Sequence, residues 1–141
     1  MTVTFRDFRP LQIAPVSLTK IVEGFASHIE PAWEHLQVRG VSMASDEILA
    51  GEAFIALKGA NVHAAKFSAE VEQLGAVAII TDTEGADLAR SQEVKIPVVE
   101  VENPRAAASV MAIRAFDNPA GKMKTVAVTG TNGKTTTCFA V

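Results

Sequence analysis

The residues best suited to do chemistry form a glycine-bracketed loop near the end of the sequence: Thr129-Gly130-Thr131-Asn132-Gly133-Lys134-Thr135-Thr136. Glycine lets main-chain N–H groups approach phosphate oxygens closely, and a helix that begins after the loop adds a partial positive charge. Lys134 would place a full charge on the β- and γ-phosphates, and the Thr135 hydroxyl could ligate Mg²⁺. The segment therefore predicts a site for ATP and Mg²⁺.

The spacing of the loop departs from the common phosphate-loop pattern. Gly-x4-Gly-Lys-Thr requires glycine where Val128 stands, and the nearest glycine is Gly130. The alternative interpretation is a glycine turn with an exposed lysine. We favour a phosphate loop because an apolar strand pattern precedes it and Lys-Thr-Thr follows. Lys134 and Thr135 are the predicted catalytic residues, Thr135 is the predicted metal ligand, and the predicted nucleotide-binding residues are Gly130, Thr131, Asn132, Gly133, Lys134, Thr135 and Thr136.

Alternating strand and helix signals precede this loop. Apolar runs predict strands, which we place around 36–41 and at 51–59, 76–81, 96–101 and 125–129. Caps and helical spacing predict helices, which we place from Ser17, over 64–74 and from Asn103 to about 116. A turn at 82–85 followed by a short helix at 86–90 is also expected. Strands that alternate with helices predict an α/β fold with a mostly parallel sheet.

Two helices carry specific expectations. Gly75 should close the helix over 64–74 as its C-cap. The helix after Asn103 should have Pro104 in its first turn. Its expected apolar face consists of Ala106, Val110, Ile113 and Phe116.

Composition limits the function classes. The chain has 141 residues, 48% of them hydrophobic, and a net charge of −3, so nucleic acid is not an expected partner. No apolar run approaches the roughly 20 residues that cross a bilayer, so membrane insertion is not expected. The first ten residues lack an apolar signal core, and a single cysteine, Cys138, fits a reducing compartment. A cytoplasmic protein is the resulting expectation.

The position of the phosphate loop predicts the domain organisation. We expect one domain over 1–102 and the beginning of an ATP-binding domain over 103–141, because the helix after Asn103 runs directly into the strand before the loop. A phosphate loop normally lies at the first strand–helix junction of a larger parallel sheet. The chain is therefore expected to stop inside its second domain.

Two segments resemble the Mur ligase family. The first is 128–137, including its shortened glycine spacing. The second is Gly51-Glu52-Ala53-Phe54-Ile55-Ala56-Leu57-Lys58-Gly59 together with Phe67 and 75–80. The second segment is similar to a block in the N-terminal, UDP-binding domain of the members that add the third residue or the terminal dipeptide. The phosphate loop is more similar to that of the third-residue enzymes, and the resemblance covers about residues 16–141.

The resemblance implies a function for the parent enzyme. It would be an ATP-dependent amide-forming ligase that adds the third amino acid to UDP-N-acetylmuramoyl-L-alanyl-D-glutamate in peptidoglycan biosynthesis, and would thus support cell-wall biogenesis, cell shape and division. The γ-phosphate of ATP would pass to a substrate carboxylate, and the amine of a free amino acid would attack the acyl phosphate. The expected cofactors are ATP and Mg²⁺. The chain alone would bind the UDP-sugar, and nucleotide weakly, without catalysing ligation.

The resemblance also implies where the uridine end of the substrate binds. Two segments would contact it; their residues are Met43, Ser45, Ala60, Asn61 and Val62. Serine and asparagine side chains can hydrogen-bond a uracil or ribose edge, and the alternative is that they are solvated turn residues. Ala44 and Asp46 replace the Asp and Arg that are usual in the family. His63, where the family often has an acid, is expected to be a surface or hydrogen-bonded group rather than a catalyst.

Three other functions stay open at this stage. The parent could be the ligase that adds the terminal dipeptide. The chain could be a non-catalytic UDP-sugar-binding module. It could also belong to an unrelated P-loop NTPase with an N-terminal interaction domain.

Overall fold

A parallel β-sheet forms the centre of the molecule. The computed structural model describes residues 14–124, 126–132 and 135. Within them, four parallel strands follow the order β3 (Val41–Ser42), β4 (Ala53–Ile55), β5 (Ala78–Thr81) and β6 (Val98–Glu100). Phe54 lies opposite Ile79, and Ile80 lies opposite Val99. The predicted α/β fold with a mostly parallel sheet is confirmed.

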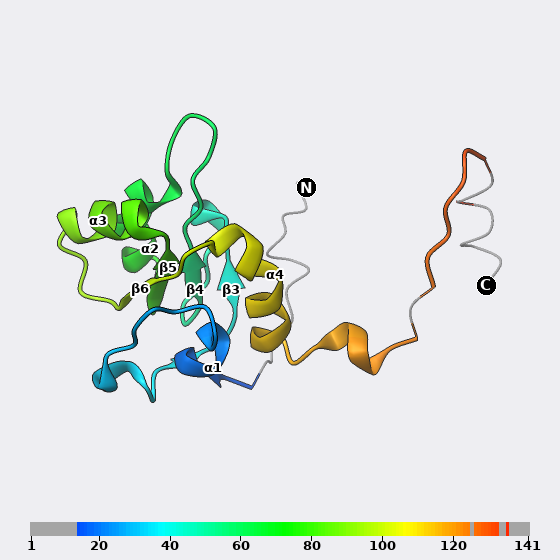
Figure 1. Ribbon diagram of the computed structural model, residues 1–141, viewed down its shortest axis with the longest axis horizontal. Coiled ribbons are helices and arrows are strands. Elements are labelled where there is room, and N and C mark those ends of the chain that lie inside the picture. Colours follow the sequence, from blue (N-terminus) through cyan, green and yellow to red (C-terminus); the bar gives the residue numbers. More distant parts are fainter. Residues whose placement is uncertain (1–13, 125, 133–134, 136–141) are drawn as a thin grey trace.

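Both faces of the sheet are buried, which explains why its strands are apolar without alternation. Ala53 and Ile55 point into one hydrophobic core, and Phe54 points into the other. Helices α1 (Leu18–Val22) and α4 (Pro104–Ala115) close the first core. Helices α2 (Ser68–Gln73) and α3 (Thr83–Ser91) close the second. The result is a three-layer arrangement with helices on both sides of the sheet (Figure 1).

Smaller elements complete the unit. Strands β1 (Val16–Ser17) and β2 (Gln37–Val38) form an antiparallel pair. Short 3₁₀ helices interrupt the connections: η2 (Pro31–Trp33), η3 (Ser45–Glu47), η4 (Ala64–Phe67) and η5 (Pro119–Lys122). The single strand expected around 36–41 was therefore wrong, because this stretch contributes β2 to one sheet and β3 to another. The chain changes partners at Gly40, which lies close to Glu52 and Phe116.

Local capping signals set most helix ends as expected. The Ser17 side chain accepts a hydrogen bond from the Lys20 N–H at the start of α1 (3.4 Å). The Asn103 side chain accepts one from the Ala106 N–H at the start of α4 (3.0 Å), with Pro104 in the first turn. Gly75 follows α2 with φ +98°, a conformation that favours glycine. These expectations are confirmed.

Helix α3 begins earlier than predicted. The expected turn at 82–85 was wrong, since α3 starts at Thr83 and includes Gly85. The Asp82 carboxylate caps the helix by accepting a hydrogen bond from the Gly85 N–H (2.8 Å). Glycine, read from the sequence as a turn residue, is here required for close packing.

The packed face of α4 also differs from the predicted one. Ala106 is exposed and Ile113 is 48% exposed, so the predicted face was wrong at these two residues, whereas Phe116 does pack against the core. Helix α4 contacts α1, and its buried residues are small ones and one methionine: Pro104, Ala107, Ala108, Met111 and Ala115. Because apolar residues occur on several sides of α4, the helical spacing of apolar residues alone did not identify the face that packs.

After α4 the chain leaves the sheet. It passes through η5 into an extended segment that runs away from the helices and strands (Figure 1). The strand expected at 125–129 is not formed by the described residues 126–129. A strand requires a neighbouring strand to accept its main-chain hydrogen bonds, and the described part of the chain supplies none there.

We predict that Gly85→Ala lowers the free energy of unfolding by roughly 3 kcal/mol. A Cβ at Gly85 would overlap the Thr81 hydroxyl and lie 2.5 Å from Cε1 of His63. The Thr81 hydroxyl is itself held by its hydrogen bond to the Ala56 carbonyl (2.9 Å). Urea denaturation measures the loss.

Gly24→Ala is the matched control. Gly24 has φ +77° but open space around it, so alanine there should cost only about 1 kcal/mol of backbone strain. Alanine in a helix is otherwise about 1 kcal/mol better than glycine. A neutral or stabilising Gly85→Ala substitution would therefore contradict the close packing.

Candidate functional site

The parallel topology collects the predicted substrate residues at one edge of the sheet. Met43 and Ser45 follow β3, and the residues 60–62 follow the neighbouring strand β4. The carboxyl ends of parallel strands lie at the same edge, where ligands bind in open α/β sheets. The connection after β4 projects beyond this edge (Figure 1). The structure thus brings both predicted segments to the same side of the fold.

These side chains are open to solvent. Met43 is 57% exposed and Val62 is 42% exposed, although both are apolar. Ala60 and Asn61 are also exposed, and Ser45 is half-buried at the start of η3. The edge therefore exposes two apolar side chains and an amide, with a half-buried serine on the neighbouring connection.

A short hairpin-like connection, the 59–62 loop, carries three of these residues. Lys58 and His63 pair as an isolated antiparallel bridge at its base. The Gly59 N–H donates a hydrogen bond to the Val62 carbonyl (3.0 Å), which closes the loop. A Cβ on Gly59 would lie 2.8 Å from that carbonyl oxygen, so the closure requires glycine. Ala60 and Asn61 form the tip of the loop.

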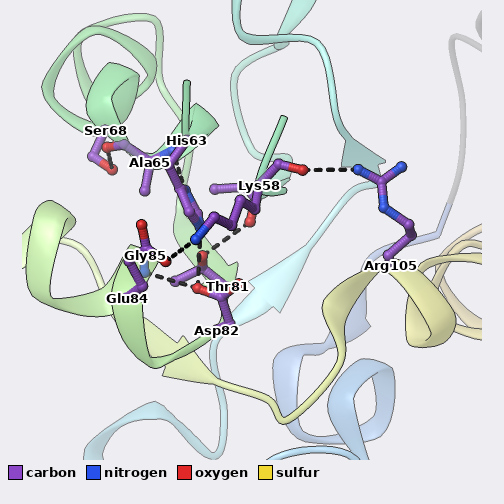
Figure 2. Close-up of polar contacts among 10 residues, drawn as sticks. Lys58, His63, Ala65, Ser68, Thr81, Asp82, Glu84, Gly85 and Arg105 are labelled. Carbon is purple, nitrogen blue, oxygen red and sulfur yellow. Dashed lines mark hydrogen bonds and ion pairs between the residues drawn. The ribbon is translucent and has the colours of Figure 1, made fainter. Parts of the chain in front are cut away.

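His63 anchors one end of the 59–62 loop in the core. Its Nδ1 accepts a hydrogen bond from the Ala65 N–H (3.1 Å), so the ring hydrogen lies on Nε2. Nε2 donates to Oδ1 of Asp82 (3.0 Å), the same oxygen that caps α3 (Figure 2). The imidazole is buried, with 3% of its side chain exposed. His63 is a hydrogen-bonded structural group, one of the two outcomes expected for it.

Lys58 anchors the other end at the surface. Its carbonyl accepts a hydrogen bond from Nη2 of Arg105 (2.9 Å), at the start of α4. Its ammonium lies 2.5 Å from Oε2 of Glu84, on α3 (Figure 2). The hydrogen bond and the negative charge of Glu84 raise the pKa of Lys58. Elements on both faces of the sheet therefore hold the base of the loop.

Sequence reasoning missed Asp82, Lys58 and Arg105. Asp82 carried a usable signal, because an aspartate directly after an apolar strand is a favoured N-cap. Arg105 could have been placed at this edge from topology alone, because it begins the helix after β6. Its contact with Lys58 joins residues 47 positions apart, and no local pattern encodes that.

The described part of the predicted phosphate loop is open to solvent. Thr131, Asn132 and Thr135 are exposed, and Gly130 has φ +150°, outside the range that side-chain-bearing residues favour. Gly133, Lys134 and Thr136 lie outside the described residues. Among the residues that are described, no three His, Cys, Asp or Glu side chains cluster as a metal site. No helix in the same part of the chain is long and apolar enough to cross a membrane.

Comparison with known proteins gives a consistent result. Residues 37–115 match the model of the Mur ligase family, catalytic domain. A UDP-N-acetylmuramoyl-L-alanyl-D-glutamate–2,6-diaminopimelate ligase of Streptomyces avermitilis is 35% identical over 105 residues, which cover 74% of this chain and 20% of the relative. The ligase of that name in Bradyrhizobium diazoefficiens is 39% identical over 107 residues, covering 76% and 20%.

A third relative matches more of the chain. The UDP-N-acetylmuramyl-tripeptide synthetase of Leifsonia xyli is 34% identical over 134 residues, covering 93% of this chain and 25% of the relative. The chain therefore spans between about a fifth and a quarter of the length of these relatives.

We predict that Asp82→Ala lowers the free energy of unfolding by about 3 kcal/mol. The substitution removes the cap of α3, which is worth about 1 kcal/mol. It also leaves the buried His63 Nε2–H without its acceptor, which costs about 1–3 kcal/mol more. Asn103→Ala is the matched control because it removes only a cap, and it should cost about 1 kcal/mol. Equal losses for the two variants, measured by urea denaturation, would show that the His63–Asp82 hydrogen bond contributes nothing.

Proposed function

Because the chain belongs to the Mur ligase family, we propose that the whole protein is an ATP-dependent ligase that adds the third amino acid to UDP-N-acetylmuramoyl-L-alanyl-D-glutamate. Relatives of this chain carry names for that reaction. The observation that carries the proposal is the juxtaposition of the two predicted substrate segments at the carboxyl edge of the sheet. None of these three relatives is named as a terminal-dipeptide ligase, so that alternative is not favoured.

Within this proposal, the carboxyl edge binds the uridine end of the substrate. The Asn61 amide, which both donates and accepts, and the Ser45 hydroxyl would hydrogen-bond the uracil or ribose. Met43 and Val62 would cover apolar surface of the ligand, which is consistent with their exposure of 57% and 42%. Ala60 at the loop tip would contribute main-chain contacts.

ATP would bind at the loop that contains Gly130. The positive φ of Gly130 and the exposure of Thr135 are compatible with such a loop. Lys134 would stabilise charge on the β- and γ-phosphates, Thr135 would ligate Mg²⁺, and Thr131, Asn132, Gly133 and Thr136 would shape the loop. ATP supplies the phosphoryl group that activates the substrate carboxylate for attack by the amine of the amino acid.

The proposal includes a domain division and a location. The 1–102 and 103–141 division stays a prediction from sequence. Ala107 and Met111 of α4 lie in the core that α1 closes. We therefore propose that α4 belongs to the first domain and that the boundary lies after this helix, later than the sequence alone placed it. We place the protein in the cytoplasm, because its single cysteine, Cys138, fits a reducing compartment. Cell-wall biogenesis, and through it cell shape and division, is the process we assign.

We predict that UDP binds the chain saturably and that Asn61→Ala weakens this binding about 5-fold, the effect of one lost hydrogen bond. Ser45→Ala should have an effect of similar size. Gln73→Ala is the control, since it removes an exposed amide at the end of α2, on the opposite edge of the sheet. Isothermal titration calorimetry measures all four Kd values. Unchanged Kd values for Asn61→Ala and Ser45→Ala would remove both residues from the site.

We also predict that Lys134→Ala lowers ligase turnover in the whole protein at least about 100-fold, because the ammonium no longer stabilises charge in phosphoryl transfer. UDP affinity and the unfolding transition of the N-terminal unit should not change. Steady-state assays of ADP release, with UDP titration in parallel, test both statements. Turnover near the wild-type rate would rule out the proposed role of Lys134.

A further inference from the structure

The Lys58–Gly59 peptide links Arg105 to the closure of the 59–62 loop. The carbonyl of Lys58 accepts a hydrogen bond from Arg105. The N–H of Gly59 donates the hydrogen bond to Val62 that closes the loop. These two groups belong to the same planar peptide unit, in which C=O and N–H point in opposite directions. A donor that fixes the carbonyl therefore also fixes the direction of the N–H.

The two ends of the loop are held differently. At the His63 end the anchor is a buried imidazole with hydrogen bonds to Ala65 and Asp82. At the Lys58 end, the Leu57 carbonyl accepts a hydrogen bond from the Ala64 N–H (2.9 Å). The side chains of Lys58 and Arg105 are exposed, and Arg105 holds the Lys58 carbonyl from α4. Gly59 has no side chain to restrain its rotation. Among the described contacts, the hydrogen bond from Arg105 is the one that acts on the Lys58 carbonyl, so it restrains the orientation of the Lys58–Gly59 peptide from outside the loop.

We propose that Arg105 is a positioning residue for the substrate, acting through the Lys58–Gly59 peptide to hold the 59–62 loop in its binding conformation. The proposal rests on the proposed function, in which Ala60, Asn61 and Val62 contact the uridine end. Arg105 itself does not contact the ligand. A charged donor on a carbonyl makes a stronger hydrogen bond than a neutral one, and it polarises the N–H of the same peptide.

The test compares Arg105→Ala with Arg114→Ala in the 141-residue chain. Arg114 lies on the same helix, and its guanidinium also donates to main-chain carbonyls, those of Ile21 and Glu23. It therefore controls for the loss of an arginine–carbonyl contact away from the loop. Arg105→Lys, which keeps one charged donor, should recover part of any loss.

Two readouts are measured for each variant. Amide hydrogen exchange followed by NMR reports the Gly59 N–H without any ligand. We expect Arg105→Ala to speed its exchange at least about 5-fold and Arg114→Ala to leave it unchanged. Titrations with UDP and with uridine report binding, and Arg105→Ala should raise both Kd values by the same factor, about 5-fold.

The possible failures are distinguishable. If the Gly59 N–H of the Arg105→Ala variant exchanges at the same rate as in the wild-type chain, the positioning role is wrong, whatever the ligand data show. A loss of affinity for UDP with none for uridine would also overturn it, because Arg105 would then contact phosphate directly. Absence of UDP binding in the wild-type chain would reject the proposed function, and the Gly59 exchange rate would still decide whether Arg105 holds the loop.

Discussion

Burial of both faces of the parallel sheet is the constraint on which the rest of the structure depends. Parallel strands need connections that cross from one end of the sheet to the other, and here helices supply most of them. Phe54 and Ile55, neighbours in β4, point into different cores, so each face requires its own helical cover. Once both faces are covered, the loops at the strand ends are the exposed part of the sheet. The candidate site lies there for that reason.

Much of the fold could be read from the sequence because its signals are local. Ser17 and Asn103 cap their own helices, and Gly75 ends α2 with a left-handed conformation. The errors arose where tertiary packing overrides a local preference. Gly85 indicates a turn by itself, yet it lies inside α3 because Thr81 and His63 leave no room for a side chain. In α4 the small side chains of Ala107 and Ala108 pack, whereas the larger Ile113 is exposed.

The residues of the candidate site were also predicted from the sequence only in part. Met43, Ser45 and the tip of the 59–62 loop were identified through a family resemblance, and the topology places them at one edge. The residues that hold the loop were not identified, because each acts on a distant partner. Asp82 is hydrogen-bonded to His63, 19 positions earlier in the sequence, and Arg105 to Lys58, 47 positions earlier. Spacing along the chain carries no record of such contacts, so only the folded arrangement reveals them.

The exposed tip of the 59–62 loop has a consequence for how this fold diversifies. Ala60 and Asn61 bury no surface in either core, and the anchors of the loop lie on either side of them. Substitutions at the tip should therefore change folding stability by less than about 0.5 kcal/mol, as is usual for surface positions. Natural selection can then alter ligand contacts at the tip while the sheet and its helices stay the same. The fold thus separates the residues that are free to vary from the glycine and histidine that are not.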